Sequence, residues 1–353
     1  MFAYPTSPRR RPGLRQRGVS LVEIMIGLVL GMLSVLVVLQ VFQRSDVSRR
    51  AALGGDDAQN SGALALTQLQ RELRQGGHGV ASFPIMGCDL LLPDGRTLTA
   101  LAPVTVNHGD IPAGDDDTDT LMVVYGATRG SPEGARILVQ QGAATYAVPA
   151  PAAFEPGDFV IASPATRPAA CTLRLTTVTA VAAPHVTIAV AAANMANGRL
   201  YNLGTTPRVQ VYAVRAQQLT VCDMLANDCT LAANADDPTV WVPVGHEIVS
   251  LRAQYGRDTT APAMDAVVDV FDQTTPTTAC GWMRVSALRL AVVARSPQQD
   301  RENVTADPPL WAGSADAPIA LDGLADWQQF RYRSFETLVP IRNMTWLQGA
   351  PGC

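Results

Sequence analysis

Lysine is absent from this sequence of 353 residues, so each of its 27 basic residues is arginine. Phosphate-binding loops of the G-x-x-x-x-G-K-[ST] type, Schiff-base enzymes and S-x-x-K enzymes all depend on a lysine side chain. The sequence therefore excludes these three kinds of chemistry.

Other motifs that carry chemistry are also missing. The sequence contains no G-x-S-x-G, no H-E-x-x-H and no dinucleotide-binding fingerprint. Cysteine pairs with C-x-x-C spacing, which zinc sites favour, do not occur. The four histidines are scattered and share no metal-ligand spacing: His78, His108, His185 and His246. We therefore predict no catalytic residue, no cofactor and no metal.

One acidic stretch has the alternation of a calcium-binding loop, with Asp115, Asp117 and Asp119 at every second position. An EF-hand needs glycine at its sixth position and glutamate at its twelfth. This chain has Thr120 and Gly126 at those positions. We interpret the stretch as a solvated acidic turn before a strand.

A basic surface interleaved with aromatic residues is missing as well. The net charge is −4, and five of the positive charges lie in the first 18 residues. Without those residues the net charge is about −9, which argues against a nucleic-acid-binding surface. The residues that most resemble such a surface are Arg331, Tyr332, Arg333, Arg342 and Trp346. We interpret them as alternation along one strand. We predict no direct nucleic-acid binding.

Charge is almost absent from residues 19–42, where Glu23 is the only charged side chain. A helix of about 20 apolar residues crosses a bilayer. A secretory signal has a shorter apolar run, of roughly 7–15 residues, and an A-x-A-like exit, which this stretch lacks. We predict a transmembrane helix over residues 19–42, with the arginine-rich side in the cytoplasm and the remaining chain outside it.

The residues before this helix form a basic leader. Five arginines and no acid precede the sequence Gly18-Val19-Ser20-Leu21-Val22-Glu23. This pattern resembles the class III leader of type IV pilins and pseudopilins, in which a prepilin peptidase cuts after the glycine and methylates the new N-terminus. The resemblance implies that residues 1–18 are removed, that the cut falls between Gly18 and Val19, and that Val19 is methylated. Most members of that family carry Phe where this chain has Val19.

Glu23 is unusual because an acid within a membrane helix costs about 2.5–3.5 kcal/mol on insertion scales and commonly marks a functional contact. The resemblance to pilins implies a partner, the freed Val19 amine of a neighbouring subunit. The alternative is an acid tolerated near the lipid headgroups. Gly27 and Gly31 form a G-x-x-x-G step, which permits close helix approach in lipid. We interpret Glu23, Gly27 and Gly31 as candidate residues for subunit assembly.

The helix is predicted to continue through residues 43–76 as an amphipathic half. The sequences Gly54-Gly55 and Asp56-Asp57 would kink or restart it, and the glycines of residues 76–79 would end it. The predicted apolar stripe consists of Ala58, Leu64, Leu66, Leu69 and Leu73.

Residues 77–353 are predicted to form a β-rich globular region of one or two sheets. Apolar or alternating β-branched runs predict strands at 121–125, 158–162, 172–181, 186–190, 208–214, 248–255, 267–271 and 285–294. Loops are predicted at 194–198 and 232–238, and an irregular stretch at 298–317. Strands without intervening helices favour an antiparallel arrangement, so the predicted fold class is α+β, with the long helix packed on a mainly antiparallel β region.

The sequence has six cysteines, at positions 88, 171, 222, 229, 280 and 353. An even number outside the cytoplasm favours disulfides, and six cysteines allow fifteen pairings. Cys222 and Cys229 flank a short polar loop and are the most plausible local pair.

Several segments between about residue 15 and residue 347 resemble the PilW family of minor type IV pilins. The most specific is the tail segment 331–344, which contains Val339-Pro340-Ile341-Arg342-Asn343. The other segments are 57–74, Gly87-Cys88, 114–126, 157–160, 247–258 and 285–296.

This resemblance implies a structural, non-enzymatic subunit of the minor-pilin complex that primes pilus growth and lies at the tip. The implied partners are other minor pilins and the major pilin, the prepilin peptidase, the inner-membrane assembly platform and, in some systems, a tip adhesin. The implied location is the inner membrane, with a single span and a periplasmic C-terminal region, and then the pilus tip. Two alternatives remain: a J-like minor pseudopilin of type II secretion, and a membrane-tethered periplasmic binding protein or enzyme.

We predict that the native protein begins at methylated Val19, because the leader pattern implies cleavage after Gly18. Mass spectrometry of the N-terminal peptide from the source cells measures this directly. A leader that is still attached in cells with an active prepilin peptidase would contradict the prediction.

Overall fold

The computed structural model describes residues 18, 20–126, 131–344 and 353, and for residues 43–54 it describes the backbone alone. The chain divides into two compact units, residues 1–53 and residues 54–353. Helix α1 spans Leu21–Gln75 and ends immediately before the predicted glycines. The strands, the short helix α2 (Ala279–Met283) and three 3-10 turns, Pro151–Ala153, Ala232–Asn234 and Trp327–Gln329, follow in the second unit.

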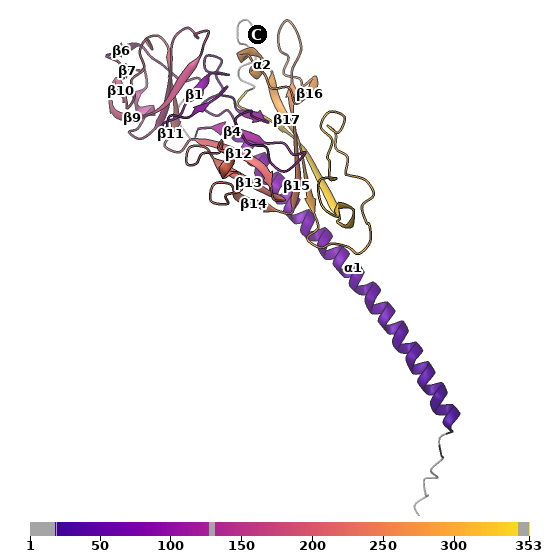
Figure 1. The fold of residues 1–353 in the computed structure, drawn as a ribbon. Helices are drawn as coiled ribbons and strands as arrows, with labels where there is room; N and C mark the ends of the chain where they lie inside the picture. The colour runs from indigo at the N-terminus through magenta and orange to yellow at the C-terminus, as the bar shows by residue number, and fades with distance from the viewer. Residues whose placement is uncertain (1–17, 19, 127–130, 345–352) are drawn as a thin grey trace, which may run out of the picture. The chain divides into compact units, whose positions relative to one another are not determined.

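The second unit contains three sheets, where the sequence had left open one or two. A five-stranded antiparallel sheet has the order β14 (Val242–His246), β13 (Gln218–Asp223), β12 (Arg208–Arg215), β4 (Leu121–Tyr125) and β3 (Val104–Val106). A four-stranded antiparallel sheet has the order β16 (Val270–Asp272), β15 (Ile248–Arg257), β17 (Val285–Arg295) and β18 (Tyr332–Pro340). Figure 1 shows both sheets beside the C-terminal part of α1.

The third sheet has nine strands. Its main path is β5 (Ala135–Arg136), β11 (Arg199–Gly204), β8 (Phe159–Ser163), β9 (Thr172–Ala182), β10 (His185–Ile188), β7 (Thr145–Ala147) and β6 (Val139–Gln141). β1 (Asp89–Leu91) pairs with β2 (Thr97–Leu98) and, in parallel, with β9. This parallel pairing departs from the otherwise antiparallel arrangement.

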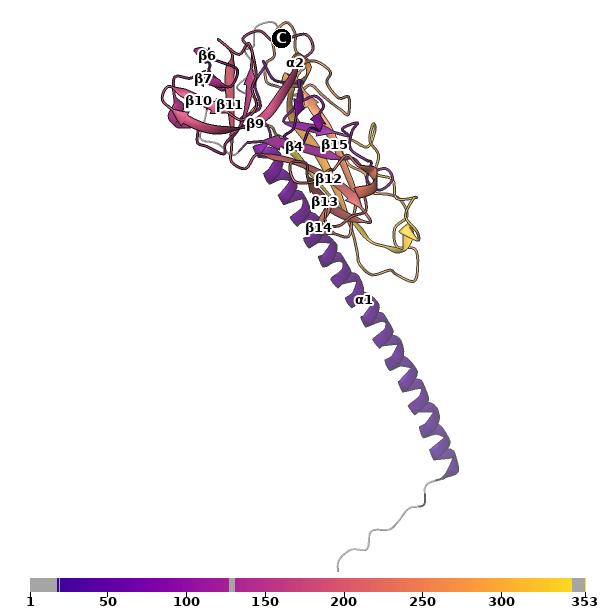
Figure 2. The same ribbon diagram turned by 60° about the vertical axis from the view of Figure 1, so that its left-hand side comes forward.

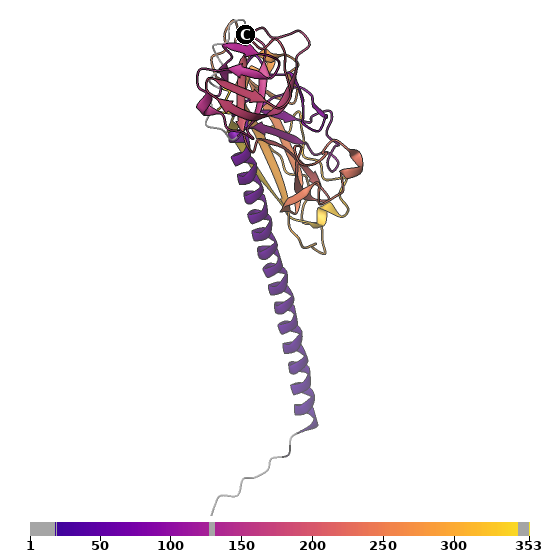
Figure 3. The same cartoon turned by 90° about the vertical axis from the view of Figure 1, so that its left-hand side faces the viewer.

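The main path of the third sheet closes on itself. β5 pairs with β11, and β6 pairs with β7. Ile137, between them, exchanges backbone hydrogen bonds of 2.9 Å with the chain at residues 197 and 198. Residues 135–141 therefore join the two ends of the path into a small barrel, hereafter the inserted barrel (residues 135–204). It surrounds its own apolar core, which includes Ile137, Tyr146 and Val160. Figures 2 and 3 show this lobe from two further directions.

The C-terminal part of α1 packs on the five- and four-stranded sheets through one stripe. Ala58, Leu69 and Leu73 are buried in the core that both sheets share, whereas Leu64 is 71% exposed. The prediction that Leu64 belongs to the stripe was wrong, because 100° per residue places it on the opposite side of the helix from Leu69. Gly62 takes part instead, since a Cβ there would overlap the Phe335 ring of β18.

Most predicted strands are present close to their expected positions. β4 matches 121–125, while β9, β12, β15 and β17 each run one or two residues beyond the predicted range. The predicted strand at 267–271 is instead the shorter β16, Val270–Asp272. No strand had been predicted at β1–β3, β5–β7, β11, β13 or β14, and β18 had been expected only as alternation along the arginine-rich tail. Most of these strands have six residues or fewer, so their side-chain alternation is too brief to identify from sequence.

Three disulfides join the cysteines of the second unit. Cys222 bonds to Cys229, the pair that the sequence had singled out. Cys88 bonds to Cys171 and so ties the segment before β1 to the inserted barrel, and Cys280 in α2 bonds to Cys353.

We expect Leu69→Ala to lower the free energy of unfolding by about 2–5 kcal/mol, because Leu69 is fully buried between α1 and the sheets. The matched control is Leu64→Ala, an exposed leucine of the same helix, which should change it by less than about 0.5 kcal/mol. Urea unfolding measures both. Equal effects of the two substitutions would contradict the described packing of α1.

Candidate assembly surfaces

The segment Leu21–Phe42 of α1 carries large apolar side chains on every side of the helix. All of its described side chains are exposed within the first unit, and by length and composition it can cross a bilayer. An isolated helix of this kind would place a continuous apolar surface in water. The segment therefore requires lipid or other helices around it.

Several small or polar residues of this segment lie on one side of the helix, whereas Gln40 lies on another. At 100° per residue, Glu23, Gly27 and Gly31 fall within an arc of about 80°. Glu23 lies in the first turn, where its negative charge complements the helix dipole. Apart from the helix's own neighbouring backbone, no described atom lies within 4 Å of where a Cβ on Gly27 or Gly31 would stand, so this side exposes a strip of backbone. The nearby Ser34 hydroxyl donates to the Leu30 carbonyl (2.8 Å).

The two residues of the predicted cleavage site are not equally described. Gly18 is exposed. Val19 lies outside the described residues, and so do the arginines of the leader.

Polar contacts fix the end of α1 on the sheets. The Tyr125 hydroxyl donates to the Glu72 carboxylate (2.6 Å), and the Gln70 amide donates to the Thr337 hydroxyl (2.6 Å). Burial, and then the Glu72 carboxylate, raise the pKa of the Tyr125 phenol well above its ordinary value. The phenol therefore remains a hydrogen-bond donor at neutral pH. After the helix ends, the Gly77 N–H donates to the Val124 carbonyl (2.8 Å).

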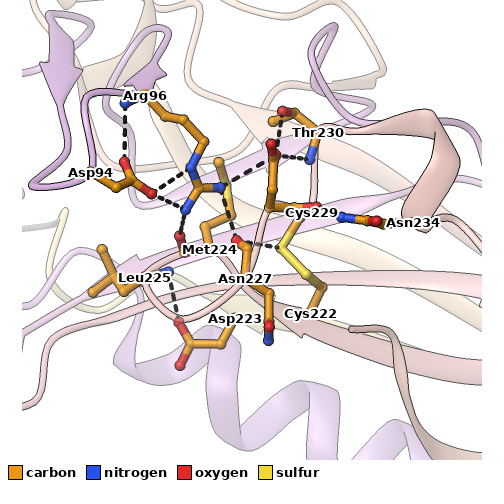
Figure 4. A network of polar contacts seen from close by, with 11 residues as sticks. Asp94, Arg96, Cys222, Asp223, Met224, Leu225, Asn227, Cys229, Thr230 and Asn234 are labelled. Carbon is orange, nitrogen blue, oxygen red and sulfur yellow. Dashed lines mark hydrogen bonds and ion pairs between the residues drawn. A yellow bond between two sulfur atoms is a disulfide. The ribbon is translucent and has the colours of Figure 1, made fainter. Parts of the chain in front are cut away.

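Two arginines attach the inserted barrel and the β1–β2 hairpin to the rest of the second unit. Arg167 of the barrel donates to the Met86 carbonyl (2.7 Å) and the Pro84 carbonyl (3.2 Å). Arg96 of the hairpin donates to the Met224 carbonyl (2.6 Å) and the Asn227 carbonyl (2.8 Å). Figure 4 shows these two carbonyls turned toward Arg96 from the loop that the disulfide Cys222–Cys229 closes. The local disulfide thus shapes a loop that the arginine holds.

Two carboxylates of the acidic stretch, those of Asp115 and Asp119, accept hydrogen bonds from other parts of the protein. The Asp115 carboxylate accepts the backbone N–H groups of Ala216 and Gln217 (2.9 and 2.8 Å). Asp119 is buried and accepts from the Ala253 N–H (2.8 Å) and the Gln273 amide (2.6 Å). The interpretation of a merely solvated turn was therefore wrong for Asp119, because strand β15 passes directly beside it. A pocket of about 410 Å³ adjoins Asp115 and its two acidic neighbours.

The histidines are not brought together. His108 is buried, with its Nε2 2.9 Å from the Thr99 carbonyl oxygen, while His185 begins β10 and His246 ends β14. Among the residues that the structure describes, no group of three or more His, Cys, Asp or Glu side chains is arranged to hold a metal ion.

The arginine-rich tail only partly follows the predicted single strand. β18 contains Tyr332 and Arg333, whereas Arg331 precedes it and forms an ion pair with Asp300 (3.0 Å). Arg342 follows β18, and Trp346 lies outside the described residues.

The fold and the sequence can now be compared with those of known proteins. An apolar N-terminal helix followed by a mainly antiparallel β region confirms the predicted fold class. The sequence model of the PilW family, described as Type IV Pilus-assembly protein W, matches residues 211–343. The expected resemblance to PilW is thus confirmed from within β12 to just beyond β18. The helix and this match together support a type IV pilus-related pilin.

The family match does not include the inserted barrel, which precedes residue 211. The solved structure of the type IV-like pilin TTHA1219 from Thermus thermophilus is also similar, at 12% identity and a TM-score of 0.30, over 81% of this chain and 97% of that chain. No curated protein matches the sequence.

We expect Arg96→Met to lower the free energy of unfolding by about 1.5–3 kcal/mol, because it leaves two loop carbonyls without their charged donor. The control is Arg208→Met. The ion pair of Arg208 with Asp223 is more exposed and has a long separation of 3.4 Å, so this substitution should lower the free energy of unfolding by less than about 1 kcal/mol. Chemical denaturation measures both. An Arg96→Met protein as stable as the Arg208→Met protein would contradict the proposed role of Arg96 in stability.

Proposed function

We propose that this protein is a minor pilin of a type IV pilus, a non-enzymatic subunit of the complex that primes pilus growth and lies at the tip. The observation that carries the proposal is the pairing of two features in one chain. One is the PilW match over residues 211–343, and the other is the apolar surface of Leu21–Phe42. A soluble or peripheral β protein does not need the exposed apolar surface of Leu21–Phe42.

In this proposal residues 1–18 are a leader that the prepilin peptidase removes, and Val19 becomes a methylated N-terminus. Residues 19–42 then hold the subunit in the inner membrane, with residues 43–76 and the β region in the periplasm. During assembly the helix exchanges lipid contacts for contacts with the helices of other minor pilins and of the major pilin. Extraction would be driven by the inner-membrane assembly platform, and in some systems the finished tip would also present an adhesin.

Glu23 would set the stagger between neighbouring subunits. The proposed partner of the Glu23 carboxylate is the Val19 amine of the next subunit. An unpaired acid within the membrane is costly, at about 2.5–3.5 kcal/mol. Pairing in the fibre removes this cost and so favours the assembled state. Gly27 and Gly31, on the same side as Glu23, would permit the close helix approach that the pairing needs.

We expect Glu23→Gln to reduce piliation strongly when it replaces the wild-type chain in a deletion strain, because the amide removes the charge and keeps the shape. Ser34→Ala on the same helix is the control, since the Ser34 hydroxyl is bonded within its own helix, and piliation should stay normal. The measurement is the number of pili per cell, together with recovery of the chain with sibling subunits from sheared fibres.

Normal piliation and normal recovery with Glu23→Gln would contradict the role of Glu23. Recovery of the wild-type chain only with secretion-machine components would favour the type II pseudopilin. Failure to recover the wild-type chain with any pilin would leave a membrane-tethered protein and contradict the proposed function.

A further inference from the structure

Strand β18 has a long free edge. At the two ends of its pairing with β17, the Ser296 N–H donates to the Arg331 carbonyl (2.8 Å) and the Ile341 N–H donates to the Ser286 carbonyl (2.9 Å). Hydrogen-bonded pairs alternate along an antiparallel ladder, and the register is regular between these ends. The backbone groups of Ser334, Glu336 and Leu338 therefore point away from β17. Within the described ranges, no backbone group or side chain bonds to these outward groups.

The other sheet edges of the second unit are short or protected, as solvent-exposed edges of natural proteins usually are. The inserted barrel closes its main sheet. β14 carries Pro243 and a register shift against β13. β3 has three residues, and its Val106 N–H is bonded to the Tyr255 hydroxyl (2.6 Å). β16 also has three residues, whereas β18 has nine.

Helix α1 extends past this edge. Gly62 lies against Phe335, and Gln70 bonds to Thr337, so α1 covers the face of β18 that carries the odd-numbered side chains. Ala65, on the other flank of the helix, lies next to Gly245 of β14. Helical geometry therefore places Ala63 and Thr67 on the flank beyond β18. Both residues are exposed and small, so a further strand beside β18 would rest its helix-facing side chains on them.

The side chains on the opposite face define the chemistry of such a strand. Glu336 and Leu338 are exposed there; the Glu336 carboxylate accepts the Ala312 N–H (3.0 Å), and Leu338 is 54% exposed. A basic residue opposite Glu336 and an apolar residue opposite Leu338 would be favourable cross-strand pairs. A second copy of this chain that paired symmetrically about Glu336 would place two like charges opposite each other. The charge therefore favours a different protein as the partner.

We propose that β18 is a strand-addition site, at which an extended segment of another protein joins the four-stranded sheet. The segment has side chains that rest on Ala63 and Thr67 of α1 and a basic side chain facing Glu336. Its backbone bonds to the outward groups of Ser334, Glu336 and Leu338, the mode of recognition in which the main chain provides affinity and alternate side chains provide specificity. The identity of the partner depends on the proposed function, under which the partner is a sibling pilin or a tip adhesin. The existence of the site does not depend on that function.

The test is hydrogen exchange at single-amide resolution on the full chain, alone in detergent and in the assembly recovered from cells. In the isolated chain the amides of Ser334, Glu336 and Leu338 should exchange on the order of 100-fold faster than those of Phe335 and Thr337, which bond to β17. In the assembly the two sets should exchange at similar rates. Fast exchange at the three outward amides in the assembly would overturn the proposal.

A variant pair tests the same edge in cells. Leu338→Pro removes an outward N–H and leaves the bonds to β17 in place, so it should abolish protection of Ser334 and Glu336 in the assembly. Leu338→Ala keeps the N–H and should preserve that protection. Equal protection with both variants would overturn the proposal. Protection that rises with the concentration of the isolated chain would also overturn it, because it would indicate that the partner is a second copy of the chain.

The two proposals fail separately. A chain found in sheared pili with unprotected outward amides overturns the strand-addition site and leaves the pilin function. A chain that is absent from pili, yet protected at these amides in the membrane fraction, contradicts the pilin function and supports the site.

Discussion

The structure depends on one constraint, an apolar helical surface that its own chain does not cover. Residues Leu21–Phe42 expose large aliphatic side chains on every side, and none of them is buried within their unit. Water cannot be the surrounding medium of such a surface, because the hydrophobic cost grows with the exposed apolar area. The helix is therefore stable only in lipid or in a bundle with similar helices, and the proposed function requires an exchange between those two environments.

The second unit is built to give the rest of α1 a rigid position. Ala58, Leu69 and Leu73 fill a core between the helix and two sheets, and Gly62 lets the helix approach β18 closely. The inserted barrel adds a separate core. It remains attached through Cys88–Cys171, the parallel β1–β9 pairing and the carbonyl contacts of Arg167. This rigidity keeps the free edge of β18 in a fixed place beside the helix.

Features that repeat along the sequence could be predicted from it. The apolar run with one acid, the three- and four-residue spacing of Leu66, Leu69 and Leu73, and the uniform β-branched strands all carry local signals. Leu64 was misassigned because its hydrophobicity alone does not show which face of the helix it occupies. The helical angle relative to Leu69 would have excluded it.

Features that depend on distant partners could not be predicted. Closure of the barrel requires residues 135–141 to pair with two different strands, and no local pattern encodes that. Cys88 and Cys171 are 83 residues apart, whereas Cys222 and Cys229 are separated by 7 and could be paired from proximity alone. Asp119 has the sequence context of a surface acid; Asn107, twelve positions earlier, donates to its carboxylate, but two further bonds come from Ala253 and Gln273, more than 130 positions further along.

The central claim is that Leu21–Phe42 moves from lipid into contact with the helices of sibling subunits. A photo-reactive side chain in place of Leu33, at the middle of the segment, reports its neighbours directly. The account predicts cross-links to lipid in resting membranes and to other pilin helices in sheared fibres. Cross-links to lipid alone, in a strain that is actively assembling pili, would contradict it.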